Sequence, residues 1–213
     1  MINIPLDGQY QSDSLSISNQ LNTNCYINVP QTQSFSQANL FGTAGINEIS
    51  TTGVIRQVNR GSHIKAGKPY FLNGETLYRQ DLSTVAGVEV FTNVALGTIS
   101  GTSRVSMADN GAQLMVLIPG GNGYIVNEAA SPIFQQITDT DFIANGAPQY
   151  VKFVDSFFVV TTDSKKFIKS ASNDGLAWNA LDFGTAESDP DDIVSLIISK
   201  NRVYIAGSET IEE

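Results

Sequence analysis

The stretch Leu114-Met115-Val116-Leu117, followed after a glycine-rich turn by Tyr124-Ile125-Val126, decides how this sequence folds. Both segments are short and apolar, and the turn between them, Gly120-Gly121-Asn122-Gly123, can adopt the positive φ angles that tight hairpins need. The stretch therefore predicts a β-hairpin.

The same hairpin pattern occurs three more times along the chain. The second strand of each hairpin carries one large residue, and these residues are spaced by 46, 43 and 44 positions: Tyr78, Tyr124, Phe167 and Ile211. The other three hairpins are Pro69-Tyr70-Phe71-Leu72 with Leu77-Tyr78, Phe157-Phe158-Val159-Val160 with Phe167-Ile168, and Val203-Tyr204-Ile205-Ala206 with Ile211. A fixed period of about 40–50 residues is typical of a β-propeller.

Further extended segments complete each repeat. A strand is predicted before every hairpin, at residues 54–58, 104–108, 150–154 and 193–198, and a fourth strand after three of them, at residues 88–94, 133–137 and 178–183. Four antiparallel strands per repeat make the blade of a propeller. The one helical feature expected is a short turn within residues 138–144. The fold class is therefore all-β and β-propeller-like, with consecutive four-stranded antiparallel blades.

The repeats also define the organisation of the chain. Residues 1–50, rich in Ser, Asn and Gln, are expected to form an extended N-terminal arm, and residues 51–213 a partial β-propeller. The blade boundaries are placed at about 51–100, 101–146, 147–189 and 190–213. The last repeat stops soon after its second strand begins, so we expect an incomplete propeller with unpaired strand edges. We also expect the chain either to oligomerise in isolation or to occur only inside a larger assembly.

Composition argues against several classes of protein. The 213 residues carry a net charge of −9, and their 12 Lys and Arg residues form no basic cluster, which disfavours sequence-specific binding of nucleic acid. A single cysteine, Cys25, excludes an intrachain disulfide and a cysteine-based zinc site. The first residues do not resemble a signal peptide, and no apolar run approaches the ~18 residues of a membrane span.

Five features invite a chemical interpretation, and for each a structural role is the better prediction. Gly120-Gly121-Asn122-Gly123 could cradle a phosphate, but a strand follows it instead of the helix that phosphate binding needs. Ser172-Asn173-Asp174-Gly175-Leu176-Ala177-Trp178 resembles the Asp-box turn of sialidase-type propellers. We expect its Asp side chain to bond backbone amides while Trp178 packs between sheets.

The remaining three features are acidic or nucleophilic. Glu187-Ser188-Asp189-Pro190-Asp191-Asp192 could hold calcium, but a solvated turn between blades fits its spacing better. His63, the only histidine, is expected in a surface loop and without a catalytic triad. Cys25 is expected to be a small buried residue. The sequence thus predicts no enzyme, and no catalytic, cofactor-binding or metal-binding residues.

Several stretches, taken in order, resemble the N-terminal half of the packaged-DNA stabilisation proteins, or tail hub (nozzle) proteins, of short-tailed bacteriophages (podoviruses). The most distinctive is Gly97-Thr98-Ile99-Ser100-Gly101-Thr102-Ser103-Arg104-Val105-Ser106-Met107-Ala108-Asp109-Asn110-Gly111. The other matching stretches are Asn24-Cys25-Tyr26-Ile27-Asn28-Val29-Pro30, Leu40-Phe41-Gly42-Thr43-Ala44-Gly45-Ile46, Gly53-Val54-Ile55-Arg56, Tyr70 to Arg79, Asp189-Pro190-Asp191-Asp192-Ile193-Val194, and Ile205 to Glu212. The sequence departs from the family pattern at Gln31, usually acidic, and at Ala44, usually proline.

This resemblance implies a structural protein of the virion tail, made in the cytoplasm of the bacterial host. Such a protein closes or extends the portal channel, retains packaged DNA and forms part of the conduit for genome ejection. The implied partners are other copies in a hexameric ring, the portal or adaptor protein, the tail needle, and tailspike or fibre proteins. DNA would pass without sequence-specific binding, and the acidic charge would suit such a passage. Solubility alone also accounts for that charge.

An alternative is a carbohydrate-binding or carbohydrate-active propeller of the tail or cell surface. A glycosidase needs a pair of carboxylates flanking a cleft, and the sequence singles out no such pair. A host interaction propeller is a third alternative, although its usual Trp-Asp or double-glycine signatures do not occur in register.

Overall fold

A computed structural model of the chain describes residues 25–28, 39–42, 45, 48–53, 57–185 and 192–212. The chain divides into two compact units, residues 1–49 and residues 50–213. In the first unit, β1 (Cys25–Asn28) pairs antiparallel with β2 (Asn39–Gly42), so Cys25 lies opposite Gly42.

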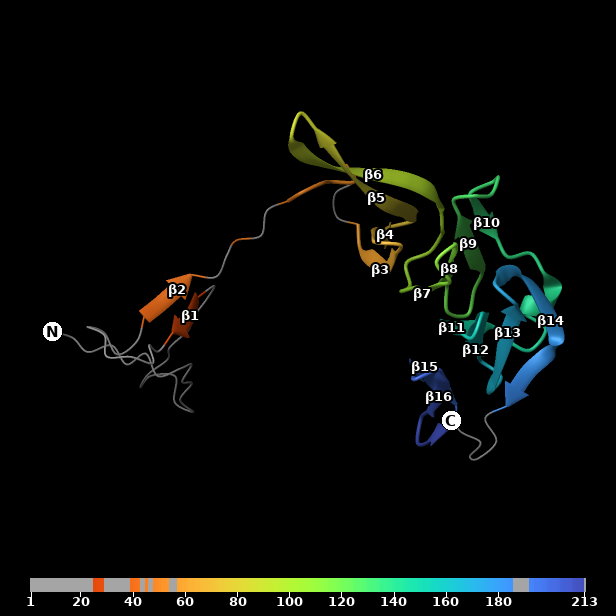
Figure 1. The fold of residues 1–213 in the computed structure, drawn as a ribbon. Coiled ribbons are helices and arrows are strands. Elements are labelled where there is room, and N and C mark those ends of the chain that lie inside the picture. The colour runs from red at the N-terminus through yellow and green to blue at the C-terminus, as the bar shows by residue number, and fades with distance from the viewer. Residues whose placement is uncertain are drawn as a thin grey trace. The chain divides into compact units, whose positions relative to one another are not determined.

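The second unit consists of four successive antiparallel sheets (Figure 1). Their strands are β3 (Asn59–Lys65), β4 (Lys68–Asn73), β5 (Thr76–Val85) and β6 (Val88–Thr98); β7 (Ser106–Asp109), β8 (Gln113–Leu117), β9 (Gly123–Asn127) and β10 (Phe134–Gln136); β11 (Pro148–Val154), β12 (Phe157–Thr162), β13 (Lys166–Ala171) and β14 (Asp174–Thr185); and β15 (Ile193–Ser199), β16 (Arg202–Gly207) and β17 (Ile211–Glu212). Within each sheet, every strand pairs with the next one along the chain. This confirms the predicted all-β class with consecutive antiparallel blades.

The hydrophobic core lies between neighbouring sheets. All five residues of β8 are buried, and alternate side chains of this strand enter two different clusters. Leu114 and Val116 pack with residues of the first sheet, including Leu72 and Leu77, because side chains of a strand point alternately to its two faces. The other face of β8 contributes Met115 and Leu117 to a second cluster, shared with the third sheet. A third cluster joins the third and fourth sheets through Val154, Val159 and Leu196.

The Asp-box-like turn has the predicted role. Asp174 Oδ1 accepts a hydrogen bond from the backbone N–H of Leu176 at 3.0 Å, and the indole N–H of Trp178 donates to the carbonyl of Gly175 at 2.9 Å. Trp178 packs on Phe142 with 4.8 Å between ring centroids. Phe142 belongs to the 3-10 helix η1 (Thr140–Phe142), the expected helical turn within residues 138–144.

Glycines with positive φ lie in the turns of two hairpins. Gly74 connects β4 to β5 with φ of +57°, and Gly120 lies between β8 and β9 with φ of +72°. The segment that could have cradled a phosphate is thus a hairpin turn leading into β9.

Two expectations about the first blade were wrong in part. The first strand was predicted at residues 54–58. Residues 54–56 lie outside the described residues, 57 and 58 are not in a strand, and the strand begins at Asn59. His63 was expected in a loop, but it lies in the middle of β3, opposite Tyr70. The reason is that β3 buries two charged residues, Arg60 and Lys65, so its sequence lacks the apolar alternation of a strand.

Burial between the sheets predicts a large difference between two isoleucines of the same unit. Ile125 on β9 is 1% exposed inside the second cluster, whereas Ile64 on β3 is 67% exposed. We expect Ile125→Ala to lower the free energy of unfolding by about 2–5 kcal/mol, because it leaves a cavity in the core. Ile64→Ala, the matched control, should change it by about 0.5 kcal/mol or less. Chemical denaturation measures both, and equal losses would contradict the assignment of the core.

Candidate functional site

The first strands of the four sheets lie next to one another. The N–H of Val105, just before β7, donates to the carbonyl of Arg60 on β3 at 3.0 Å. The N–H of Val151 on β11 donates to Ser106 Oγ on β7 at 3.1 Å. These bonds join first strands of successive sheets, so that side chains on their exposed faces share one surface.

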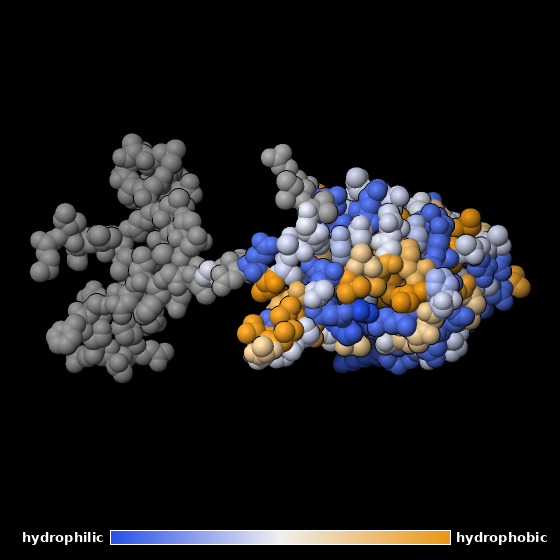
Figure 2. All heavy atoms as spheres, turned by 90° about the horizontal axis from the view of Figure 1, so that it is seen from above, coloured by the Kyte–Doolittle hydropathy of each residue, from blue (hydrophilic) through white to orange (hydrophobic). Residues whose placement is uncertain are grey.

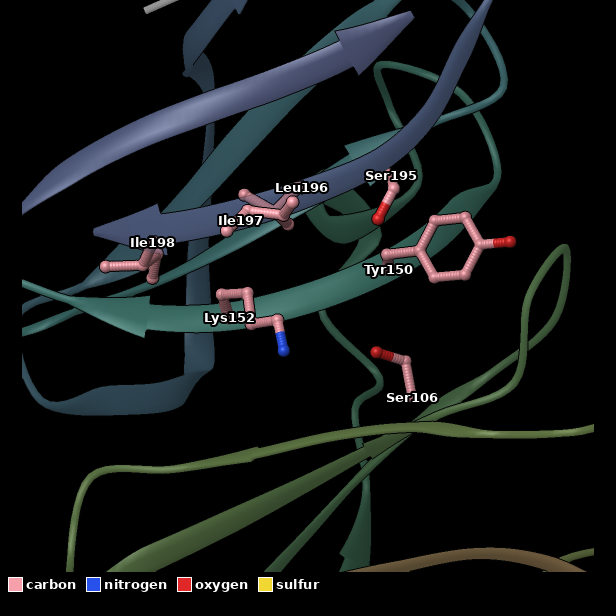
Figure 3. Close-up of a pocket in the computed structure, with 7 residues that line it drawn as sticks. All are labelled: Ser106, Tyr150, Lys152, Ser195, Leu196, Ile197 and Ile198. Atoms are coloured by element: carbon pink, nitrogen blue, oxygen red, sulfur yellow. The ribbon is translucent and has the colours of Figure 1, made fainter. Parts of the chain in front are cut away.

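A cleft of about 330 Å³ opens along β7, β11 and β15 on this surface (Figure 3). Its lining residues are Ser106, Tyr150, Lys152, Ser195, Leu196, Ile197 and Ile198. The Lys152 side chain extends from β11 into the space between β11 and β7, on the same side as the Ser106 hydroxyl, and the ring of Tyr150 lies at one end of the cleft (Figure 3). A second cleft of about 340 Å³, which also includes Tyr150, is lined by Asp163, Asp192 and Val194 among others.

The chemistry of this cleft suits non-covalent binding. It offers two serine hydroxyls, one amine and a tyrosine ring with its own hydroxyl, beside the exposed side chain of Ile197. Among the described residues, no group of three His, Cys, Asp or Glu side chains is arranged to hold a metal ion. A cleft of this composition can hold a polar chain or segment through hydroxyl and amine hydrogen bonds and contact with Tyr150.

Among the residues that the structure describes, Arg60 is the most deeply buried charged one, at 2% exposure. Its guanidinium donates to three backbone carbonyls within 3.1 Å: Ser103 at 2.7 Å, Gly74 at 3.1 Å and Ile99 at 2.6 Å. Burial lowers the pKa of Arg60, and the negative charge of Glu75 opposes that shift. Through these hydrogen bonds, the Arg60 side chain links the segment between the first two sheets to the β4–β5 turn.

A polar network crosses the same junction at another place. Tyr70 Oη donates to Glu128 Oε1, and Arg79 Nη1 lies 3.1 Å from that carboxylate oxygen. Arg79 also forms a bidentate ion pair with Asp81, in which Nε donates to Oδ1 at 2.9 Å and Nη2 donates to Oδ2 at 2.5 Å. Separately, His63 Nε2 donates to Asp109 Oδ2 at 2.6 Å, which links β3 to β7. These contacts tie the first sheet to the second by charge as well as by packing.

The network shifts the pKa values of its members. Burial alone would raise the pKa of Glu128, but the hydrogen bonds from Tyr70 and Arg79 together hold it below its ordinary value. The hydrogen bond from Arg79 is the main cause of the lowered pKa of Asp81. Burial, and then the bond to Glu128, raises the pKa of Tyr70. Both carboxylates are therefore charged at neutral pH.

The structure places the remaining sequence features as follows. Cys25 lies on β1, and its side chain is outside the described residues, so its predicted burial stays a prediction. Of the acidic stretch 187–192, only Asp192 is described, and it lines the second cleft, 3.8 Å from Lys165. Sequence reasoning named none of the cleft residues as a site. The signal it had was the polar or aromatic character of Tyr150 and Lys152 on either side of buried Val151.

The four successive antiparallel sheets, packed face to face through shared cores, define a β-propeller-type scaffold with a cleft along its first strands. A family model described as bacteriophage P22 Gp10, β-propeller, matches residues 2–213. The chain belongs to this family, which confirms the resemblance carried by residues 97–111. Membership of this family identifies the chain as a phage structural protein.

A search of curated proteins returned no match. Among solved structures, the crystal structure of BamB from Moraxella catarrhalis is similar, with a TM-score of 0.54 and 9% sequence identity. The similarity covers 82% of this chain and 49% of that chain, so this chain spans about half the length of that protein. At this identity the likeness concerns the fold alone. Within the described residues, no helix has the length and apolar character needed to cross a membrane.

The lowered pKa of Glu128 predicts how stability depends on pH. Its folded pKa lies below its unfolded value, so its contribution to stability is present above about pH 4.5 and is lost as the pH falls through the lower, folded value. Glu128→Gln should therefore make the free energy of unfolding fall less steeply below that pH.

Glu89→Gln, at an exposed position, is the matched control and should leave the slope nearly unchanged. Urea denaturation at a series of pH values measures these slopes. An unchanged slope in Glu128→Gln would show that the network does not stabilise the carboxylate.

Proposed function

We propose that this protein is a component of the phage tail hub, or nozzle, which closes or extends the portal channel and retains the packaged genome. The observation that carries this proposal is the family match over residues 2–213, together with successive propeller blades in the second unit. A structural and non-enzymatic role also fits the cleft, whose hydroxyls, amine and aromatic ring favour binding over bond cleavage.

The partners in this proposal are further copies of the chain in a ring, hexameric by the family resemblance, with portal or adaptor proteins on one side and needle, tailspike or fibre proteins on the other. A ring built from this chain needs surfaces that carry little repulsion between copies, because each copy has a net charge of −9.

The retention role is tested by removing the protein from the virion. We expect particles assembled from a phage with an amber codon in this gene to fill with DNA and then lose it. The expected readout is a large loss of nuclease-protected DNA relative to particles grown in a suppressor host. Adding purified full chain to freshly filled particles should restore protection. Particles that lack the protein and still keep their DNA would refute the proposal.

The conduit role depends on charge and has its own test. A wall of net negative charge repels phosphate over about a Debye length, ~8 Å at physiological salt, and lets DNA slide. Asp192, whose side chain is 84% exposed, lies at the second cleft. If this surface faces passing DNA, Asp192→Lys should slow genome ejection, and more so at low salt.

Asp192→Asn, which removes the charge without reversing it, is the matched control. It should fall between the wild type and Asp192→Lys in time-resolved ejection of dye-labelled DNA. Equal ejection rates in all three would show that charge at this position has no conduit role, and the solubility interpretation of the acidic charge would stand.

A further inference from the structure

The two clefts on the first strands form one continuous groove. Both include Tyr150 of β11, and residues 195–198 of β15 line the first cleft while residues 192–194 line the second. Residue numbers rise together along both strands, so β11 and β15 run in the same direction there. We call the surface formed by residues 149–152 and 192–198 the groove. Its side along residues 192–198 is roughly 20 Å long, because each extended residue spans about 3.3 Å.

The two ends of the groove carry opposite charges. Lys152 lines one end, whereas Asp163 and Asp192 line the other. The Asp192 carboxylate is 3.8 Å from the Lys165 amine, but these side chains are 84% and 44% exposed, respectively, and exposed ion pairs are weak. Two carboxylates against one lysine leave the second end with a net negative charge, while the first end is positive.

The polar groups at the Lys152 end are available to a ligand. Among the described residues, neither the Lys152 amine nor the Ser195 hydroxyl has a hydrogen-bond or ion-pair partner. Both groups border the same cleft, with the ring of Tyr150 at one end of it (Figure 3). An amine near a hydroxyl can donate hydrogen bonds to one carboxylate, and such charge-assisted bonds are stronger than bonds between neutral groups.

The groove also offers apolar contact, although this alone does not mark a site. Val194 and Ile197 are 52% and 58% exposed, and Tyr150 is 39% exposed. Apolar residues also reach the surface of residues 50–213 in other places, among hydrophilic ones (Figure 2). The groove is distinguished by the combination of exposed apolar side chains with opposite charges at its two ends.

This distribution of charge favours a polypeptide over DNA as the ligand. A DNA strand carries a phosphate about every 3.4 Å, so a strand lying along the groove would place phosphates at both ends. Lys152 would attract these phosphates, and Asp163 and Asp192 would repel them. An extended polypeptide can instead place an acidic side chain at one end and a basic one at the other. Because its side chains alternate between two faces, residues four apart point to the same side, about 13 Å from each other.

We propose that the groove binds an extended segment of another virion protein. An acidic side chain of this segment contacts Lys152 and Ser195, and a basic side chain about four residues away contacts Asp163 and Asp192. The residue between them packs on Tyr150, and bridging waters complete the hydrogen bonds of this polar contact. The identity of the partner as a virion protein rests on the proposed function, whereas the order of charges rests on the groove itself.

The first experiment selects ligands from a random peptide library displayed on filamentous phage, with the purified full chain immobilised. We expect the selected peptides to share an acidic and a basic residue about four positions apart. Selection on Lys152→Glu should lose the acidic residue of this motif. Lys200→Glu is the matched control, because Lys200 is exposed in the β15–β16 turn, outside the groove, and its substitution changes the net charge equally. It should return the wild-type motif.

Fluorescence anisotropy then measures the affinity of one selected peptide. Lys152→Glu should weaken its binding at least about tenfold, because the acidic residue of the peptide then faces a like charge. Replacing that acidic residue by lysine should restore binding to Lys152→Glu. Asp192→Asn should weaken binding of the original peptide about threefold, since it removes one exposed charge. Lys152 and Asp192 are exposed, so thermal unfolding of both variants should match that of the wild type.

The inference is overturned if the wild-type chain selects no motif with opposite charges, or if Lys152→Glu binds the selected peptide as tightly as the wild type. It is also overturned if a short DNA duplex displaces the peptide from the wild-type chain at physiological salt, because the groove would then bind the DNA backbone. Failure here is separable from failure of the proposed function, because DNA retention by particles that lack the protein is measured independently.

Discussion

The two middle sheets of the second unit each share both faces with their neighbours, and the first and fourth sheets each share one. A four-stranded antiparallel sheet of this size cannot form a core by itself. Because side chains alternate between the two faces of β8, this strand contributes residues to two hydrophobic clusters. Leu114 and Val116 pack toward the first sheet, while Met115 and Leu117 pack toward the third. β12 repeats the arrangement, with Phe158 and Val160 on one side and Val159 on the other. Each sheet is therefore stabilised by the sheets next to it, and a substitution in a shared cluster destabilises both sheets that form the cluster.

Polar contacts determine how neighbouring sheets are aligned, since apolar packing alone is not directional. Arg60 is held by carbonyls of the β4–β5 turn and of the segment between β6 and β7. Removing its side chain would leave those acceptors without a donor, which costs more than the bonds contribute. Gln113 plays a similar part between the second and third sheets. Its side chain accepts from the N–H of Gly175 at 2.8 Å and donates to Asp174 at 3.3 Å. The Asp-box-like turn is thus part of an interface between sheets.

The sequence predicted the repeat, the fold class and most strands, because the hairpins are strongly apolar and regularly spaced. It misplaced the first strand because β3 owes its position to Arg60 and Lys65, two buried charges whose partners come from distant segments. Hydrogen bonds to residues this far away in the sequence produce no periodic pattern of apolar and polar residues. The position of His63 was misread for the same reason, since its partner Asp109 is 46 residues away. Tyr150 and Lys152 become a site only when β7 and β15 are placed beside β11, and that arrangement is tertiary.

The distribution of apolar surface separates two kinds of surface on this molecule. Along the first strands, the exposed side chains of Tyr150 and Ile197 stand among hydroxyls and an amine, so that surface can contact a polar partner without excluding all water. At the tip of the β5–β6 hairpin, Val85 pairs with Val88 across the ribbon, and Val90 lies next to them on the same face. Because these valines are exposed, their contact with water has a free-energy cost that a dry interface would remove. The hairpin tip is therefore suited to an apolar contact without water, whereas the cleft is suited to a hydrated contact with polar groups.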